Sequence, residues 1–259
     1  MKLIPFLLLN LLWLTSSHGQ TKEKLNWERP VFIGASVTDG FHLEEKALPF
    51  FSPISKSLGL DHFLDDTLIP PHGRTKNFGS KFTSLATEPH AKYQAKAAHN
   101  AKPTVLFAID YLFWYLSAKP EARGPGLANL TRLEFLELGL AHLATFKCPV
   151  VVGNIPDAVE SINVVISHKQ YPGVKTIAQA NQRITDWQKK HPNVSIIDLH
   201  QFHQSSIKNR KIKLPNTTLP AGKSRSLLHW DGLHPNSAGA RALLLKSLQA
   251  LGVPKKQLQ

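Results

Sequence analysis

Continuous apolar runs recur along the chain and predict the strands of a parallel sheet. They are rich in Val, Ile, Leu and Phe and do not alternate with polar residues, which is typical of strands covered on both faces. Three such runs span residues 30–35, 103–109 and 149–153, and the last strand is expected at residues 194–199, where Ser195 and Asp198 interrupt the apolar residues. A further strand is expected within residues 60–69, and residues 71–81 are expected to form a loop.

Helical patterns lie between these runs. Thr131 and Glu134 have the spacing of a capping box, and leucines then follow at positions 133, 136, 140 and 143, on one helix face. Further helices are expected at residues 84–100, 177–190 and 235–251, the last with Pro235 at its first position. Residues 200–229 are polar and basic, and we expect them to form an irregular surface excursion. Alternating strands and helices predict an α/β fold with a central parallel sheet.

The first 19 residues have the pattern of a secretory signal peptide. Lys2 is followed by an apolar run from Leu3 to Leu14, and small residues stand at positions 17 and 19. The run is short for a membrane span, although an uncleaved anchor is the alternative. We therefore expect a secreted or periplasmic protein, with residues 20–259 forming a single domain and no transmembrane segment after cleavage.

The chain is strongly basic, with a formal net charge of +13 over 259 residues. Such a charge on an exported protein suits an anionic surface, such as a membrane or an acidic polysaccharide, although a solvated basic surface without a partner explains it equally well. The basic residues are dispersed and no binding module is present, which argues against nucleic acid. Cys148 is the single cysteine, so the chain forms no internal disulfide.

Two motifs at opposite ends of the chain carry the candidate chemistry. The first apolar run ends in Gly34-Ala35-Ser36, and parallel strands deliver functional residues at their carboxyl ends. Near the other end, Asp231 precedes His234 by three residues, so its carboxylate can orient the imidazole. His234 could then accept a proton from Ser36. Either motif alone is common, and the alternatives are a strand followed by a small-residue loop and a surface Asp–His pair.

Together the motifs resemble the SGNH or GDSL-like hydrolases. Gly34-Ala35-Ser36-Val37-Thr38 is similar to the first block of that family, with alanine where aspartate is usual, and Asp231-Gly232-Leu233-His234 is similar to the last. Asn77-Phe78-Gly79 resembles the second block, whose glycine N–H helps to form the oxyanion hole. The resemblance implies a three-layer α/β/α sandwich and hydrolysis of esters by a serine acyl-enzyme route without a cofactor or metal. The α/β-hydrolase alternative fits less well, because its nucleophile elbow has glycine where Thr38 stands.

The third block departs from the family pattern. Asp110 stands where the family has an oxyanion-stabilising asparagine, and a carboxylate has no proton to donate. Asp110 could be protonated, Asn77 or Asn154 could complete the hole with the N–H groups of Ser36 and Gly79, or Asp110 could bind substrate or hold a loop. We favour the positioning role. On that basis Asp110→Asn should keep or raise esterase activity.

These motifs predict an exported esterase with Ser36 as nucleophile, His234 as general base and acid, and Asp231 orienting the histidine. The expected partner is a small-molecule or polysaccharide ester, either an O-acylated carbohydrate or a lipid. A non-catalytic member of the fold that binds a glycan or an anionic surface is the alternative. Turnover of a nitrophenyl ester that depends on Ser36 distinguishes the two.

Overall fold

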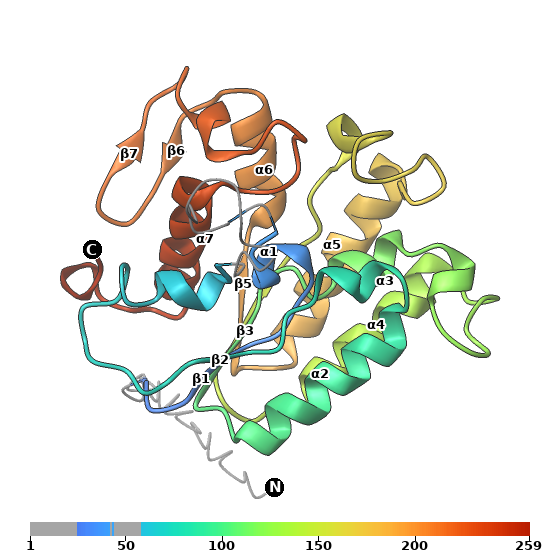
Figure 1. Cartoon of the computed structure of the whole chain (residues 1–259), viewed down its shortest axis with the longest axis horizontal. Coiled ribbons are helices and arrows are strands. Elements are labelled where there is room, and N and C mark those ends of the chain that lie inside the picture. The colour runs from blue at the N-terminus through green and yellow to red at the C-terminus, as the bar shows by residue number, and fades with distance from the viewer. Residues whose placement is uncertain (1–24, 42, 44–57) are drawn as a thin grey trace, which may run out of the picture.

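Five parallel strands form the central sheet of this computed structural model, which describes residues 25–41, 43 and 58–259 (Figure 1). The strand order is β2-β1-β3-β4-β5. Their bounds are Pro30–Phe32 for β1, Lys76–Asn77 for β2, Val105–Ala108 for β3, Val150–Gly153 for β4 and Val194–Ile197 for β5. Two further short strands, β6 (Ile212–Lys213) and β7 (Thr218–Leu219), pair antiparallel outside the sheet. The expected signal peptide at residues 1–19 and most of the segment 42–57 lie outside the described residues.

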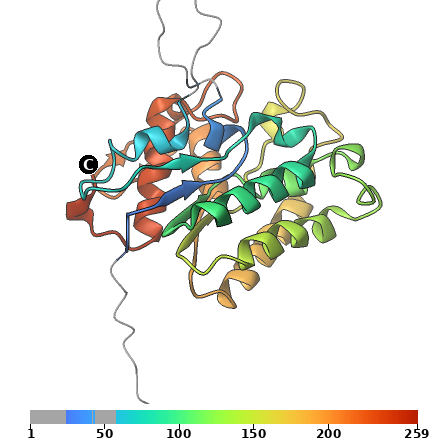
Figure 2. The same cartoon turned by 60° about the horizontal axis from the view of Figure 1, so that its bottom comes forward.

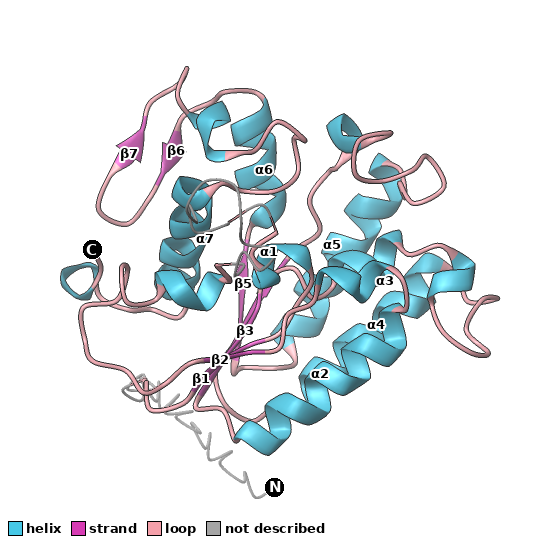
Figure 3. Ribbon diagram, viewed as in Figure 1, coloured by secondary structure: helices cyan, strands magenta, loops and turns pink. Residues whose placement is uncertain are grey.

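Helices cover both faces of the sheet (Figures 2 and 3). The α-helices are α1 (Ser36–Asp39), α2 (Thr87–Ala101), α3 (Phe113–Ser117), α4 (Arg132–Ala144), α5 (Val174–Lys189), α6 (Leu199–Ile207) and α7 (Ser237–Ala250). Short 3-10 helices are η1 (Leu60–Phe63), η2 (Lys81–Ser84), η3 (Pro120–Ala122), η4 (Val159–Ser161), η5 (Ser224–Leu227) and η6 (Lys255–Gln257). No helix of the described residues is long and apolar enough to cross a membrane.

The continuous apolar character of the strands follows from this three-layer arrangement. Side chains alternate between the two faces, so neighbouring apolar residues enter different cores. Leu106 and Val150 pack with α2, α4 and α5, whereas Phe107 and Val151 pack with α7 and η1. The expectation of a three-layer α/β/α sandwich around a parallel sheet is therefore confirmed.

The expected second strand at residues 60–69 is wrong. That segment forms η1 and a loop, with Leu60, Phe63 and Leu64 buried against the α7 layer at helical spacing. The edge strand is β2, which lies in the segment expected to be a loop. A strand of two polar residues carries no apolar pattern, and its pairing with β1 is visible only in three dimensions.

Two helix expectations also need correction. Residues 199–207 form α6 within the segment expected to be irregular, because Asp198 caps the helix by accepting a hydrogen bond from Gln201 N–H. Helix α7 begins at Ser237 rather than Pro235, with the Asn236 side chain as its cap. The capping box of Thr131 and Glu134 is confirmed at the start of α4.

Candidate active site

Ser36 lies where β1 ends, as the first residue of the four-residue helix α1. β1 pairs with β2 on one side and with β3 on the other, so the strands that follow β1 in the sequence are added on opposite sides of it. Such a switch point leaves a crevice outside the carboxyl ends of neighbouring strands. The sheet topology therefore places Ser36 beside Asp110, which follows β3.

The structure brings Ser36, His234 and Asp231 together although 198 positions separate the serine from the histidine. His234 Nε2 lies 2.8 Å from Ser36 Oγ, and His234 Nδ1 lies 2.7 Å from Asp231 Oδ2. The two side chains that support Ser36 are almost fully buried, with exposed fractions of 1% for Asp231 and 2% for His234. This arrangement can move a proton from the serine hydroxyl to an imidazole whose tautomer is fixed by a carboxylate.

Asp231 is held by the loop that it begins. Its Oδ1 accepts hydrogen bonds from the N–H groups of Leu233 and His234, which leaves Oδ2 for the imidazole. Gly232 has φ of +74°, a conformation that L side chains rarely adopt. Burial opposes ionisation of Asp231, but the hydrogen bonds from His234 and the two backbone N–H groups prevail and hold its pKa well below the usual range.

The lowered pKa of Asp231 predicts acid-sensitive stability. The unfolded chain protonates this carboxyl near its ordinary pKa of 3.8, whereas the folded protein keeps it ionised to lower pH. The contribution is therefore fully present above about pH 5 and decreases as the pH falls below about 4 toward the folded-state pKa. Urea unfolding at pH 3 and pH 6 should show a smaller pH dependence for Asp231→Asn than for wild type. An unchanged dependence would contradict this assignment.

Asp110 holds the serine turn from behind. Its Oδ1 accepts from Ala35 N–H at 3.0 Å and from the Thr38 hydroxyl at 2.5 Å. Its Oδ2 accepts from Val37 N–H at 2.8 Å and from Thr38 N–H at 3.4 Å. The carboxylate therefore binds backbone N–H groups on both sides of Ser36. Burial raises the pKa of Asp110, and the four donors oppose that rise.

Comparison with solved structures identifies the fold. No family model and no curated protein sequence matches the chain. An acetylxylan esterase from Geobacillus stearothermophilus aligns over 89% of this chain and 96% of its own, with a TM-score of 0.54 and 15% identity. A GDSL-like lipase from Parabacteroides merdae aligns over 90% and 99%, with a TM-score of 0.53 and 12% identity. The chain has the GDSL-like hydrolase fold. An α/β hydrolase from a Lake Arreo metagenome also aligns, with a TM-score of 0.51, 12% identity and coverage of 89% and 97%.

In this GDSL-like fold the oxyanion donors expected from the second block have other acceptors. Gly79 N–H donates to Asn77 Oδ1 at 2.8 Å, and Asn77 Nδ2 donates to Thr38 O and Asp61 Oδ1. A Cβ on Gly79 would approach Asp39 N to 2.9 Å, so this glycine allows the loop to pack against α1. Gly79 and Asn77 therefore brace the serine turn in this structure, and their expected part in an oxyanion hole stays a prediction.

Asn154 is also engaged elsewhere. Its Nδ2 donates to Asp198 Oδ1, and its Oδ1 accepts from His200 N–H. It therefore stabilises the start of α6, and its expected role as an oxyanion donor stays a prediction. Asp110 accepts from the N–H groups of Ala35 and Val37, which flank Ser36. Ser36 N–H itself has no acceptor in the described part of the chain.

Gln94 of α2 supports the same turn and was not singled out from the sequence. Its amide accepts from Gly34 N–H and donates to Gly34 O, both at 2.9 Å. A Cβ on Gly34 would collide with Asp110 Oδ1 and the Thr38 side chain. The sequence signal for this contact is a polar residue, Gln94, in an alanine-rich helix. The signal does not identify the partner, because Gly34 is 60 positions away.

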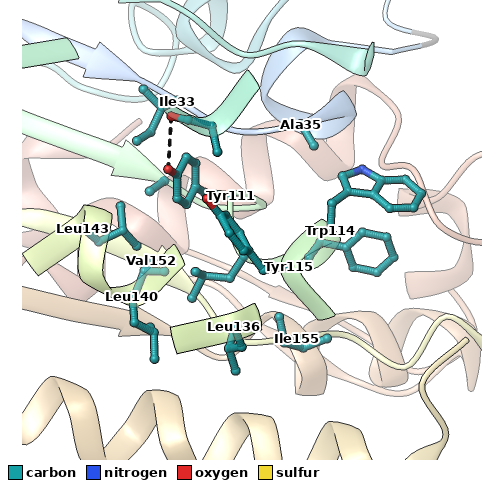
Figure 4. Packing of buried hydrophobic residues seen from close by; sticks show 14 of the residues in the cluster. Ile33, Ala35, Tyr111, Trp114, Tyr115, Leu136, Leu140, Leu143, Val152 and Ile155 are labelled. Carbon is teal, nitrogen blue, oxygen red and sulfur yellow. Dashed lines mark hydrogen bonds between the residues drawn. The ribbon is translucent and has the colours of Figure 1, made fainter. Parts of the chain in front are cut away.

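An apolar pocket of the GDSL-like fold adjoins Ser36. Its lining is mainly aliphatic and aromatic, with Ser36, Asp110 and His203 as the polar exceptions, and its other members are Val37, Phe113, Pro156, Leu199, Phe202, Leu228, Leu233, Pro235 and Leu243. The aromatic cluster after β3 is otherwise core, as Figure 4 shows for Tyr111, Trp114 and Tyr115. Phe113 is therefore the member of that cluster that reaches the pocket.

Two other kinds of chemistry, a metal site and a reactive cysteine, have little support among the described residues. Among the residues that the structure describes, no group of three or more His, Cys, Asp and Glu side chains could hold a metal ion. His200 and His203 lie close to the backbone carbonyls of Ile155 and Gly232, respectively. Burial raises the pKa of Cys148 to about 11, which disfavours its reactive thiolate.

Proposed function

We propose that this protein is an exported serine hydrolase that cleaves carboxylic esters through an acyl-enzyme intermediate. The observation that carries the proposal is the chain of contacts from Ser36 Oγ to His234 at 2.8 Å and from His234 to Asp231 at 2.7 Å. The structural neighbours support ester chemistry, since they are described as an acetylxylan esterase and a GDSL-like lipase. The secretory pattern of residues 1–19 supports export.

The proposed reaction has two halves. In the first, Ser36 Oγ attacks the ester carbonyl while His234 Nε2 takes its proton, and the imidazolium then gives that proton to the departing alcohol. In the second, His234 takes a proton from water, whose oxygen attacks the acyl carbon. The imidazolium then gives that proton to Ser36 Oγ as the bond from Oγ to the acyl carbon breaks, which releases the carboxylic acid and restores Ser36. Asp231 keeps the Nδ1–H tautomer and stabilises the imidazolium. Ser36 N–H donates to the oxyanion.

The proposed substrate is an O-acyl carbohydrate or a lipid ester. The apolar pocket beside Ser36 supports burial of an acyl group, since ligand sites combine apolar walls with few polar groups. The net charge of +13 supports action on an acidic polysaccharide or at an anionic surface.

Two measurements on the wild-type protein test this function. We expect turnover of 4-nitrophenyl acetate, and we expect a fluorophosphonate to label Ser36, as located by mass spectrometry of the labelled peptide. Protein denatured before exposure to the probe should not be labelled. Absence of both turnover and labelling would favour the alternative of a non-catalytic glycan-binding protein.

A further inference from the structure

The end of the chain carries most of its positive charge. Residues 199–259 contain ten Lys and Arg residues but a single acidic residue, Asp231, and so account for most of the formal net charge of +13. Asp231 is buried against His234. Arg241 forms an ion pair with a carboxylate, and Arg225 donates to a backbone carbonyl. The other eight form no ion pair with a described carboxylate: Lys208, Arg210, Lys211, Lys213, Lys223, Lys246, Lys255 and Lys256.

The fold gathers three of these lysines around one surface pocket. Lys211 and Lys213 flank Ile212, whose buried side chain packs with residues of α6 and α7 and fixes the β6–β7 hairpin. Lys246 lies on α7, 33 positions from Lys213, and its Nζ donates to Lys213 O at 3.4 Å. The pocket is lined by Asp198, Gln201, Phe202, Ser205, Lys211, Ile212, Lys213 and Lys246.

Two further lysines extend the positive charge beyond the pocket. The turn between β6 and β7 lies against the end of the chain, where Asn216 Nδ2 donates to Leu258 O at 2.7 Å. The exposed Lys255 and Lys256 belong to this end, and Figure 1 shows it on the same side of the molecule as the hairpin. The positive charge therefore covers a continuous area, which we call the hairpin basic surface and define as Lys211, Lys213, Lys246, Lys255 and Lys256.

The protein itself does not neutralise this charge. Burial lowers the pKa of Lys246, so the surroundings of its ammonium group oppose the charged form. Asp198 lines the same pocket and partly offsets this effect, but its Oδ1 already accepts from Asn154 Nδ2 and Gln201 N–H. Three lysines thus share the pocket with one carboxylate. Such a concave positive site attracts anionic groups from outside.

We propose that the hairpin basic surface binds an acidic polysaccharide, whose anionic groups pair with Lys211, Lys213 and Lys246. Gln201 and Ser205 line the same pocket, and their side chains can both donate to and accept from sugar hydroxyls. Lys255 and Lys256 pair with anionic groups further along the polymer. The inference goes beyond the proposed function, since this binding requires neither Ser36 nor ester turnover.

Two other anionic partners fit the surface less well. Proteins that lie on membranes combine basic residues with apolar side chains that enter the bilayer. In residues 199–259 the one exposed large hydrophobic side chain is Trp230, which is not among the residues that line the pocket. Single-stranded nucleic acids stack their bases on aromatic side chains, and the one aromatic residue of the pocket, Phe202, is buried.

Isothermal titration with polygalacturonate, and with neutral dextran as the uncharged polymer, tests the proposal. The wild-type protein should bind polygalacturonate, more weakly as the ionic strength rises, and should not bind dextran. Each exposed ion pair changes an equilibrium constant by up to about fivefold, so loss of three lysines should raise Kd about tenfold. The variant that tests this combines Lys211→Gln, Lys213→Gln and Lys246→Gln.

A control variant separates local binding from net charge. It loses the same charge at exposed lysines elsewhere and should change Kd by less than about threefold, because most of these charges lie beyond screening distance. It combines Lys96→Gln, Lys175→Gln and Lys190→Gln. Circular dichroism should show that both variants are folded.

Three results would overturn the proposal. The first is wild-type protein that does not bind polygalacturonate or binds dextran equally well. The second is an equal loss of binding in the two variants. The third is tighter binding of phosphatidylserine vesicles or of oligothymidine through the same three lysines. Lysine-dependent binding of polygalacturonate by a protein without ester turnover would contradict the proposed function and leave this inference standing.

Discussion

Replacing Ser36 by alanine should lower kcat for 4-nitrophenyl acetate by roughly 10⁵–10⁶-fold. The reason is that the proposed route has no substitute for Ser36 Oγ as nucleophile, and His234 Nε2 then has no hydroxyl to deprotonate. His234→Ala should cost a similar factor, because the serine is a weak nucleophile without its base. The double variant should be no slower than either single variant, since groups that act as a unit are strongly non-additive.

Ser226→Ala is the matched control for this prediction. Ser226 is an exposed serine whose hydroxyl donates to Lys223 O, and its replacement should change kcat by less than twofold. Circular dichroism and thermal unfolding should show that all variants are folded. Activity of Ser36→Ala within tenfold of wild type would mean that another group is the nucleophile. Multiplying effects in the double variant would mean that the serine and histidine act independently.

The site could be predicted from the sequence where its residues are carried by local motifs. Ser36 follows an apolar strand, and Asp231 and His234 are close in sequence, so their positions at one sheet edge follow from the α/β alternation. The buried strands and the capping box of α4 were predictable for the same reason. These features depend on side-chain periodicity and on contacts within a few residues.

The remaining features depend on partners far apart in the sequence. Gln94 binds the backbone of Gly34, and His203 binds that of Gly232, so no spacing signals either contact. The edge strand β2 was missed because two polar residues have no period. Gly79 resembles an oxyanion donor in sequence, but its N–H has Asn77 as an acceptor within its own loop.

Asp110→Asn should lower both stability and activity, contrary to the expectation from the sequence alone. The carboxylate accepts from Ala35 N–H on one oxygen and from Val37 N–H on the other. An amide has one oxygen and one NH2 group, so in either orientation the NH2 group opposes one of these donors. Each buried donor without an acceptor costs about 1–3 kcal/mol, and the free energy of unfolding should fall by this amount.

The loss of activity should follow from displacement of Ser36. A misplacement of about 1 Å can cost about 10²-fold in rate, so kcat of Asp110→Asn should fall by that order. Asp198→Asn is the matched control, because Asp198 caps α6 through one oxygen and asparagine caps helices about as well as aspartate. Urea unfolding and nitrophenyl acetate turnover of the two variants provide the comparison. Unchanged stability with higher activity in Asp110→Asn would show that the carboxylate opposes the oxyanion rather than holding the turn. A loss confined to Asp110→Asn would place this buried carboxylate among the groups that position the nucleophile.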